Sequence, residues 1–312
     1  MSQDGSRRGY IAGLAAYASW GFFPIYFHAL KPAGALEILA QRVFWSVITV
    51  AIIITAIRRW DAIRALLRRP RAVAGIAGAA LLIAVNWCTY IYGVNSGHVV
   101  ETSLGYFINP LISVLFGVLV FRERLRGAQW GALAIGAAAV AVITVDYGRL
   151  PWIALSLAIT FGSYGLVKKT LGLPPTDGLL MEAAVLTLPA IAYLGWLQAD
   201  GRSTFGAGSG WHTALLVLTG LATAVPLLMF ADAANRIPMS HLGMIQYVAP
   251  VLQLLCGLVI FHEPMPPAQL AGFILVWVAI VVFTWDAVRH ARRAPAPRVP
   301  VAEPATLTTA DA

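Results

Sequence analysis

Apolar residues fill the chain in blocks of about 20, the number of helical residues that crosses the hydrocarbon core of a bilayer. Short polar breaks separate one block from the next. This alternation predicts an all-α membrane protein with ten transmembrane helices. Their expected ranges are 9–30, 34–57, 72–95, 98–121, 127–146, 151–168, 177–198, 211–234, 239–261 and 267–287.

Lysine and arginine residues lie mostly in alternate loops between the predicted helices. Of the 22 basic residues, 18 lie in one set of loops, which includes the N-terminal segment and the tail, and 3 lie in the other set. Loops rich in basic residues stay in the cytoplasm. We therefore expect both termini to be cytoplasmic in a multi-pass protein of a bacterial-type inner membrane.

Composition agrees with a membrane protein. The chain is 59% hydrophobic and 12% charged, whereas a soluble domain carries about 25% charged residues. A net charge of +8 would suggest nucleic acid, but membrane topology explains the basic residues, so no nucleic-acid partner is expected. Cys88 and Cys256 lie inside apolar blocks without a CxxC partner, which predicts neither a disulfide nor a metal site.

The sequence aligns with itself without gaps at an offset of 140 residues. Between residues 110–146 and 250–286, 11 positions are identical. The polar residues and prolines carry the argument, because apolar helices share leucine and alanine by chance. They are Pro110 with Pro250, Glu123 with Glu263, Gln129 with Gln269 and Asp146 with Asp286. The pattern indicates a duplication with five helices in each copy.

Because five is odd, the second copy must enter the membrane inverted. The matched hairpins agree, since FRERLR (121–126) carries arginines and FHEPMP (261–266) carries none. Inverted repeats are typical of transporters with a midplane substrate site; the alternative is a duplicated scaffold or receptor that moves nothing. The expected parts are a cytoplasmic N-terminus at 1–8, repeats at 9–146 and 149–286, and a disordered cytoplasmic tail at 287–312.

Longer motifs carry a family resemblance. They are WGFFPIYFHAL (20–30), EILAQRVFWS (37–46), NWCTYIYGVN (86–95), ETSLGYFINPL (101–111), FRERLRGAQW (121–130), LPWIALSLAITFGSYGLVKK (150–169), PLLMFADAANRIPMSHLGMIQYVAP (226–250) and FHEP (261–264). On these motifs, residues 9–286 resemble the drug/metabolite transporter superfamily, with two EamA-type five-helix repeats, and within it the RarD subfamily. The resemblance implies an inner-membrane permease that exports drugs or metabolites, and the subfamily's label refers to chloramphenicol.

Enzyme motifs are missing from the sequence. No Gly-Lys dipeptide occurs, which removes a Walker A loop and an ATP-driven pump. His262 and Glu263 have no second histidine four residues later, and the segment 162–165 lacks the spacing of a nucleophile elbow. We therefore expect no enzymatic activity, no metal and no cofactor. Transport would draw on a gradient of the substrate or of protons.

Ionisable residues at membrane depth are candidates for the substrate or ion pathway, because charge inside a bilayer is costly. The candidates are Glu37, Arg42, Glu101, Glu182 and Asp232. Three of them have structural alternatives. Asp232 can pair with Arg236 four residues later, while Glu101 can cap the helix that it opens. Glu37 can be hydrated near the outer interface.

Pro110 and Pro250 occupy equivalent places in the two repeats, and each removes a helical hydrogen bond. The carbonyls that they free belong to Tyr106 and Gln246. A free carbonyl in lipid costs several kcal/mol, so these turns are expected to be hinges that border a water-filled cavity. The alternative is a plain kink satisfied by a neighbouring helix. Polar neighbours that fit a cavity lining are Asn109, Tyr247 and Gln253.

Polar and aromatic residues in four other spans are further candidates for the cavity wall. They are Trp20, Asn86, Tyr90, Asn95, Tyr164 and Asn235. Aromatic walls with a few amides suit a flat, amphipathic small molecule. The same residues equally suit ordinary helix packing with satisfied amides.

Arg42 and Glu182 are equivalent at the 140 offset, and neither has an opposite charge three or four residues away. At a rise of about 1.5 Å per residue, inverted symmetry places their backbones within about 6 Å in depth. We expect them to pair across the repeat interface in at least one conformation. The alternative is that each side chain snorkels separately.

These patterns predict a secondary-active permease that exports small metabolites or drugs by alternating access. The expected partners are a small-molecule substrate, membrane lipid and, as a candidate coupling ion, the proton. A passive facilitator is the alternative within transport, and a non-transporting scaffold or sensor is the alternative outside it. The GxxxG pairs at 9–13 and 93–97 fit intramolecular packing as readily as dimerisation, so the oligomeric state stays open.

Overall fold

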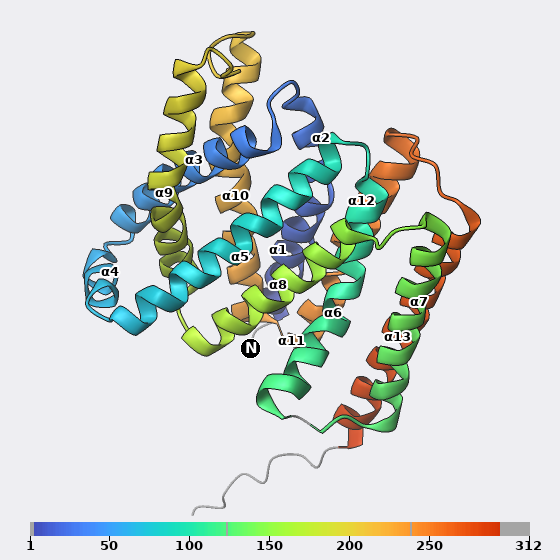
Figure 1. Ribbon diagram of the computed structural model, residues 1–312. Coiled ribbons are helices and arrows are strands. Elements are labelled where there is room, and N and C mark those ends of the chain that lie inside the picture. The colour runs from blue at the N-terminus through green and yellow to red at the C-terminus, as the bar shows by residue number, and fades with distance from the viewer. Residues whose placement is uncertain (1–2, 123, 238, 294–312) are drawn as a thin grey trace, which may run out of the picture.

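The computed structural model describes residues 3–122, 124–237 and 239–293, and all regular secondary structure in these ranges is helical (Figure 1). The first half holds α1 (Gln3–Gly21), α2 (Phe23–Ala29), α3 (Ala35–Ala56), α4 (Trp60–Leu67), α5 (Pro70–Asn95), α6 (Val99–Phe121) and α7 (Gly127–Tyr147). The second half holds α8 (Trp152–Leu171), α9 (Pro175–Ala199), α10 (Gly210–Arg236), α11 (Met239–Ile245), α12 (Val248–Leu255), the π-helical η1 (Cys256–Ile260) and α13 (Pro267–Arg293). The all-α prediction is confirmed for this part of the chain.

Seven of the described helices are long and apolar enough to cross a membrane. They are Ala35–Ala56, Pro70–Asn95, Val99–Val120, Gly127–Asp146, Thr176–Ala199, Gly210–Arg236 and Pro267–Asp286. Two shorter apolar helices, Trp152–Lys168 and Val248–Ile260, fall where the sixth and ninth spans are predicted. The first predicted span corresponds to α1 and α2 together.

Helices extend beyond the first and last predicted spans at both ends of the described chain. Helix α1 begins at Gln3, inside the segment predicted as a cytoplasmic N-terminus. Helix α13 continues to Arg293, so the first residues of the predicted disordered tail are helical. The remainder of that tail, 294–312, lies outside the described residues. Helices α1 and α13 each continue past their apolar block, because extending an existing helix by one residue costs little.

The first predicted span is broken between α1 and α2. Phe22 separates the two helices, and Pro24 lies in the first turn of α2. Backbone N–H groups in the first turn have no partner within the helix, so proline costs no hydrogen bond there. Phe27 of α2 is 1% exposed and belongs to the core.

The ninth predicted span is also broken, between α11 and α12 at Gln246 and Tyr247. Pro250 lies in the first turn of α12, where it cannot donate to the carbonyl of Gln246. That carbonyl instead accepts from the N–H of Ala249 over 3.3 Å. The equivalent Pro110 lies inside α6, which continues without a break. The two prolines therefore act differently: one coincides with a break in the helix and the other does not.

A short amphipathic helix, α4, occupies a segment that the hydrophobic pattern leaves as a loop. Its apolar residues Ile63 and Leu66 are buried, while Arg64 and Asp61 face outward and pair over 3.0 Å. The helix has only eight residues, too few for a periodic pattern to stand out in the sequence.

The helices pack in pairs that repeat between the two halves. In the first half α5 and α6 both contact α8, and in the second half α10 and α12 both contact α1. In the same way, α3 contacts α9 and α10, and α9 contacts both α3 and α5. Helices α7 and α13 lie side by side as a pair at one edge of the bundle (Figure 1). Each half therefore inserts its first helix between helices of the other half.

A glycine allows α3 and α10 to pack closely. A Cβ atom at Gly220 of α10 would lie 2.4 Å from the carbonyl oxygen of Trp45 on α3. No side chain fits at that distance, so glycine is required for the two backbones to approach this closely. Arg42 lies three residues before Trp45, and Thr223 lies three residues after Gly220, so this approach sets how far apart their side chains lie.

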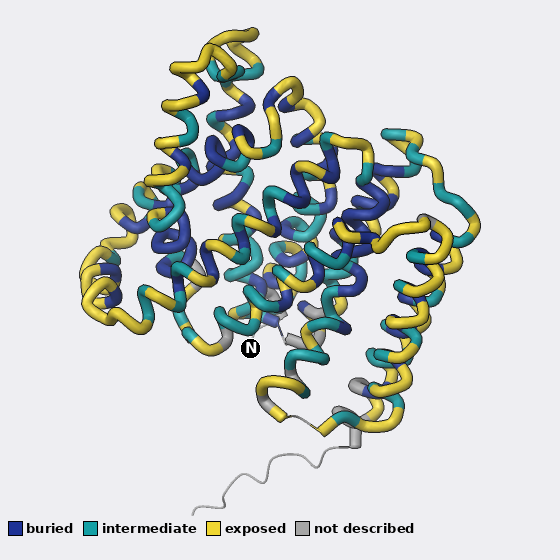
Figure 2. Tube along the Cα trace, in the orientation of Figure 1, coloured by how far each residue is buried: buried dark blue, intermediate teal, exposed yellow. Residues whose placement is uncertain are grey.

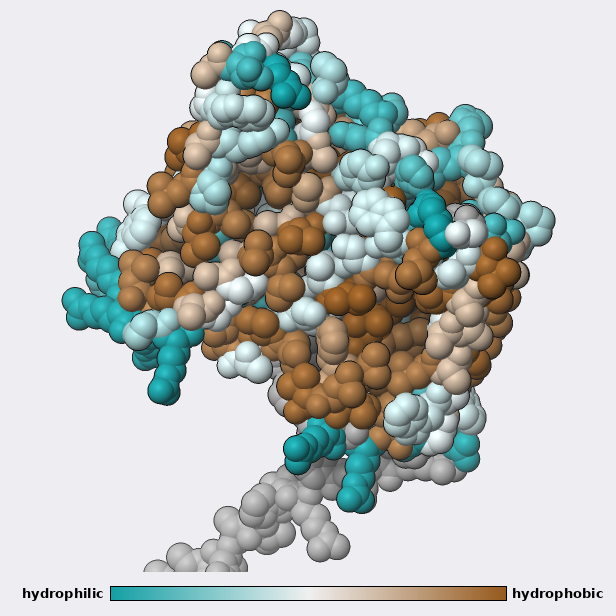
Figure 3. All heavy atoms as spheres, viewed as in Figure 1, coloured by the Kyte–Doolittle hydropathy of each residue, from teal (hydrophilic) through white to brown (hydrophobic). Residues whose placement is uncertain are grey.

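Exposed apolar side chains form the outer surface of the bundle. Buried positions follow the inner helix faces in Figure 2, and a broad hydrophobic area crosses the middle of the molecule in Figure 3, with hydrophilic groups at its upper and lower ends. Leu188 on α9 is 78% exposed and Val281 on α13 is 65% exposed. An apolar belt of this kind matches the hydrocarbon region of a bilayer.

Candidate functional site

Arg42 lies in the middle of α3 and is only 4% exposed. Its guanidinium carbon is 3.9 Å from the centroid of the Trp87 ring, 5.6 Å from that of Phe23 and 5.7 Å from that of Phe27. A cation within about 6 Å of a ring centroid is attracted to the ring face. We call these three rings the aromatic cage. Its walls come from α2 and α5, and α3 supplies the cation.

A hydrogen bond to α10 anchors this guanidinium. Arg42 Nε donates to Thr223 Oγ1 of α10 over 2.8 Å, and Thr223 Oγ1 donates to the carbonyl of Thr219 over 2.9 Å. Among the residues that the structure describes, no carboxylate lies within 4 Å of Arg42. Arginine stays charged and has five N–H donors. Burying such a charge without an anion costs several kcal/mol, and cation–π contacts offset only part of that cost.

Asn86 lies beside Trp87 on α5 and is fully buried. Its Nδ2 donates to the carbonyl of Leu157 and to Thr160 Oγ1, each over 3.0 Å, while its Oδ1 accepts from the Tyr106 hydroxyl over 3.3 Å. Asn86 thus joins α5, α6 and α8 with its amide satisfied, as the packing alternative expected.

Two buried hydroxyls near the aromatic cage have no hydrogen-bond partner within the described part of the chain: Ser46 Oγ and the Tyr90 hydroxyl. Ser46 lies four residues after Arg42, on the same face of α3. The Tyr90 ring lies 5.9 Å from that of Phe27 and 5.7 Å from that of Tyr106. An unsatisfied buried hydroxyl costs about 1–3 kcal/mol, so both are available to a bound molecule.

A small hollow of about 10 Å³ lies beside the cage, bordered by Ser46, Trp87 and Glu182. It has room for about one water molecule. Glu182 of α9 is 3% exposed. Its carboxylate accepts from Lys168 Nζ over 2.8 Å and from the Tyr164 hydroxyl over 3.0 Å, both on α8. The remaining walls of the hollow are apolar: Val43, Ile83, Leu179, Ala183 and Leu186.

Arg42 and Glu182 therefore lie near the same hollow but do not pair with each other in this conformation. Glu182 pairs with Lys168, and Arg42 binds Thr223. Helices α3 and α9 do pack together, as the predicted pairing requires. The predicted ion pair fails here because Lys168, predicted at the very end of its span, reaches back into the bundle.

Glu101 and Glu37 are buried acids that join neighbouring segments. Glu101 Oε1 accepts from the backbone N–H of Ile153 over 3.1 Å and its Oε2 pairs with Arg149 over 3.2 Å, so it caps α8 rather than its own helix. Glu37 Oε1 accepts from the N–H of Thr204 over 2.7 Å. Glu37 is 3% exposed, so the hydrated alternative is wrong in this conformation.

Two acidic residues lie near loops that the basic-residue count predicts to be cytoplasmic, and both form ion pairs. Asp232 pairs with Arg236 over 2.7 Å and with Arg8 of α1 over 3.4 Å, which agrees with its structural alternative. Asp177, at the start of α9, accepts two hydrogen bonds from Arg59 over 3.1 and 2.7 Å. These hydrogen bonds and the carboxylate charge raise the pKa of the Arg59 guanidinium above its ordinary value.

The other predicted wall residues lie outside the cage. The Trp20 ring lies 5.1 Å from that of Tyr17, and Asn95 donates to the carbonyl of Ala33 over 3.4 Å at the end of α5. Asn235 is exposed near the end of α10. Trp20, Asn95 and Asn235 therefore lie apart from the site. The predicted residues that lie around the aromatic cage and the hollow are Arg42, Asn86, Tyr90, Tyr106, Tyr164 and Glu182.

The residues around the two prolines form a separate group. The Tyr247 ring stacks on that of Phe107 at 6.5 Å, and Asn109 Oδ1 is buried with no partner among the described residues. Gln246 is half-buried. Its carbonyl accepts from the N–H of Ala249 in the same segment, so neither a water-filled cavity nor a neighbouring helix is needed to satisfy it.

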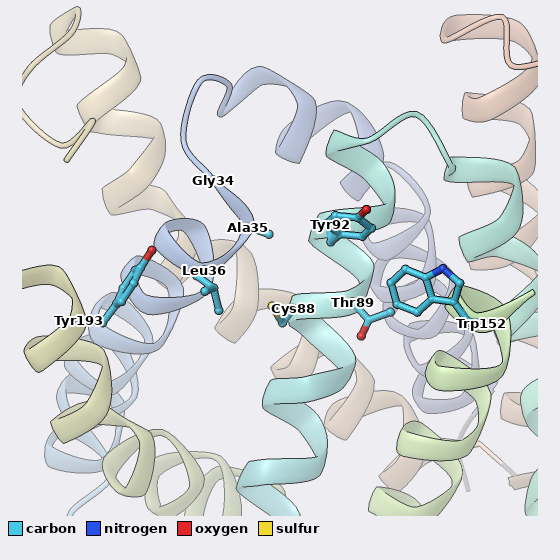
Figure 4. A pocket seen from close by; sticks show the side chains of 8 residues that line it. All are labelled: Gly34, Ala35, Leu36, Cys88, Thr89, Tyr92, Trp152 and Tyr193. Atoms are coloured by element: carbon cyan, nitrogen blue, oxygen red, sulfur yellow. The ribbon is translucent and has the colours of Figure 1, made fainter. Parts of the chain in front are cut away.

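A second, larger hollow of about 490 Å³ opens on the surface between the start of α3 and the end of α5 (Figure 4). Cys88 and Thr89 form its floor on α5, and Leu36, Tyr92 and Trp152 border it with 53%, 46% and 47% of their surface exposed. The residues that line it are mostly apolar and none is charged, so it lacks the charged anchor that the Arg42 site has.

Comparison with known proteins decides the family. The family model described as "EamA-like transporter family" matches residues 7–145 and again residues 150–285. The chain belongs to the EamA-like transporter family. Within it the chain groups with RarD: "Protein RarD" of Streptomyces exfoliatus is 51% identical over 99% of this chain and 98% of its own. An uncharacterized transporter of Pseudomonas aeruginosa is 41% identical, over 95% of this chain and all of its own.

One solved crystal structure aligns with this EamA-type transporter at a TM-score of 0.55 and 20% identity, over 93% of this chain and 99% of the other. At that identity the likeness shows the fold alone. Family membership and the apolar helices make the protein a multi-pass transporter of the bacterial inner membrane.

Several residues of this EamA-type transporter's central site were missed by sequence reasoning. They are Phe23, Phe27, Trp87, Thr223, Ser46 and Lys168. Aromatic residues are common in membrane helices, so nothing in the sequence marks which rings meet a cation. Trp87 had one available signal: it adjoins Asn86, which was a candidate.

Proposed function

We propose that this EamA-type transporter is a secondary-active exporter of small metabolites or drugs that works by alternating access. The observation that carries the proposal is the enclosure of Arg42. A charged site inside the bundle, next to a hollow of only about 10 Å³, admits no organic substrate until helices separate. A site that must open to be used fits a carrier better than a permanently open channel or a rigid scaffold.

The proposed organisation has ten spans, both termini in the cytoplasm, and repeats at 9–146 and 149–286. The seven long apolar helices support it, together with the α1–α2 pair, α8 and the α11–η1 segment as the other three spans. The exchange of first helices between the halves supports rocking of one repeat on the other. The outward direction follows the resemblance to exporters of drugs and metabolites.

For the coupling ion we propose the proton, with Glu182 as its binding group. Glu182 is 3% exposed, borders the hollow near Arg42, and is held by Lys168 and Tyr164. An acid at this depth that can lose or regain a partner as helices move is suited to bind and release a proton.

The experiment has two stages. A metabolite library is first screened by thermal shift on the purified full-length protein, because a ligand that binds only the folded carrier raises its apparent stability. The strongest hit is then followed in proteoliposomes with and without an imposed pH gradient, using wild type and Glu182→Gln. We expect the gradient to drive accumulation in wild type, and Glu182→Gln to equilibrate the substrate without accumulating it.

Each outcome separates the alternatives. Equilibration without accumulation in wild type would identify a passive facilitator. Binding without any flux would favour a scaffold or sensor, and accumulation unaffected by Glu182→Gln would remove Glu182 from the coupling step.

A further inference from the structure

We infer that the Arg42 site binds the carboxylate of a small organic monoanion whose flat, apolar body packs in and beside the aromatic cage. This substrate class rests on the proposed transport function. It is carried by the juxtaposition of a buried guanidinium, three ring faces and two unpartnered hydroxyls.

The charges around the site favour an anion. Glu182, across the hollow, is matched by Lys168, and Glu101 is matched by Arg149. Glu37 lies on α3 five residues before Arg42, which places it about 140° away around the helix, and it binds the N–H of Thr204 instead. The guanidinium of Arg42 is therefore left without a carboxylate among the described residues, and an incoming anion would supply the missing charge.

The donors at the site fit one carboxylate. The guanidinium uses Nε for Thr223 and keeps its other N–H groups, which form the planar fork that binds a carboxylate through two hydrogen bonds. The hydroxyl of Ser46, one turn along α3, is a further donor with no present partner, and so is that of Tyr90. A doubly charged phosphate would need a second cation, and Lys168 is already engaged by Glu182.

The apolar surfaces select the body of the ligand. Trp87 faces Arg42 and also borders the hollow, so a ligand held by the guanidinium would lie against this ring. The other walls of the hollow are aliphatic side chains from α3, α5 and α9. Ring faces and aliphatic walls stabilise a flat apolar group by burial and offset stacking.

The test compares matched ligands on the purified full-length protein. The probes are benzoate, phenylacetate, 3-phenylpropionate and indole-3-acetate, each beside its primary amide, which has nearly the same shape without the charge. Binding is measured at pH 7.4 by thermal shift and by titration calorimetry. We expect at least one carboxylate to bind and its amide to bind roughly tenfold or more weakly, as loss of a charge-assisted hydrogen bond predicts.

Variants then assign the binding to this site. Arg42→Gln should weaken carboxylate binding roughly 10- to 100-fold while leaving amide binding unchanged. Ser46→Ala removes a hydroxyl that has no partner, so the protein should fold as wild type and bind the carboxylate several-fold more weakly. Arg64→Gln, an exposed arginine on α4, is the matched control and should bind as wild type. If Arg42→Gln does not fold, Arg42→Lys retains the charge and should show an intermediate loss.

The results separate this inference from the proposed function. Equal binding of each carboxylate and its amide, no binding by any carboxylate, or carboxylate binding that neither the Arg42 nor the Ser46 variants change would overturn the anion site. Arg42-dependent carboxylate binding without flux in proteoliposomes would keep the site and overturn transport. Flux of neutral solutes without carboxylate binding would keep transport and overturn the site.

Discussion

Replacing Gly220 with alanine tests whether the close approach of α3 and α10 builds the Arg42 site. The added Cβ would lie 2.4 Å from the carbonyl oxygen and 2.5 Å from the carbonyl carbon of Trp45. An ordinary contact is about 3.5 Å, so the two helices must separate by about 1 Å. The hydrogen bond from Arg42 to Thr223, one turn away on each helix, is 2.8 Å long and would then exceed bonding distance.

The energy follows from three effects. Overpacking costs about 1–3 kcal/mol, and loss of a hydrogen bond to a charged group costs about 1.5–3 kcal/mol. Alanine returns up to about 1 kcal/mol through its better helix propensity. We therefore expect Gly220→Ala to lower the free energy of unfolding by about 1.5–6 kcal/mol, measured by SDS titration in mixed micelles with tryptophan fluorescence.

The matched control is Gly195→Ala on α9, where an added Cβ would meet nothing within 4 Å. This variant gains the helix propensity without the clash, so its stability should equal or slightly exceed that of wild type. If Gly220→Ala proved as stable as Gly195→Ala, the close contact would not be rigid, and the reasoning that links it to the Arg42 site would be refuted.

Two further predictions follow from the charges. Cysteines placed at residues 64 and 204 in a cysteine-free background should be labelled from opposite sides of the membrane, with residue 64 cytoplasmic; labelling from the same side would contradict the proposed topology. Lys168→Met leaves the carboxylate of Glu182 buried and unpaired, and should destabilise the protein by about 3–5 kcal/mol in the same SDS titration. Adding Glu182→Gln should restore most of that loss, and a double variant no more stable than Lys168→Met alone would show that the pair is not coupled.

The sequence allowed Arg42 to be identified because one basic residue inside an apolar block has no ordinary reason to be there. Asn86 and Glu182 stand out because they too are polar or charged residues inside apolar blocks. Their partners did not, since Lys168 lies at the very end of its predicted span and Thr223 is one of several threonines in an apolar helix. A polar residue at depth is visible in sequence, whereas the group that satisfies it depends on which helices touch.

The breaks in the first and ninth spans illustrate a second limit. Hydropathy reports only that a segment is apolar, so α1 and α2 merge into one predicted helix despite Pro24. Phe27, which contacts Arg42, lies on α2 after this break. The sequence of a segment does not show whether its helix is straight or broken. The packing around the segment sets the direction that its aromatic rings face.

The exchange of first helices between the two halves has a consequence for biogenesis. Helix α8 packs against both α5 and α6, so these helices lack this contact until about 20 further residues have been inserted. Helix α1 lacks its contacts with α10 and α12 for longer. At about 5–20 residues per second of synthesis, the first helix resides in the bilayer for roughly 10–50 s before its partners emerge. During that interval its inner face contacts lipid, translocon or chaperone, and the pace of the ribosome governs when native assembly begins.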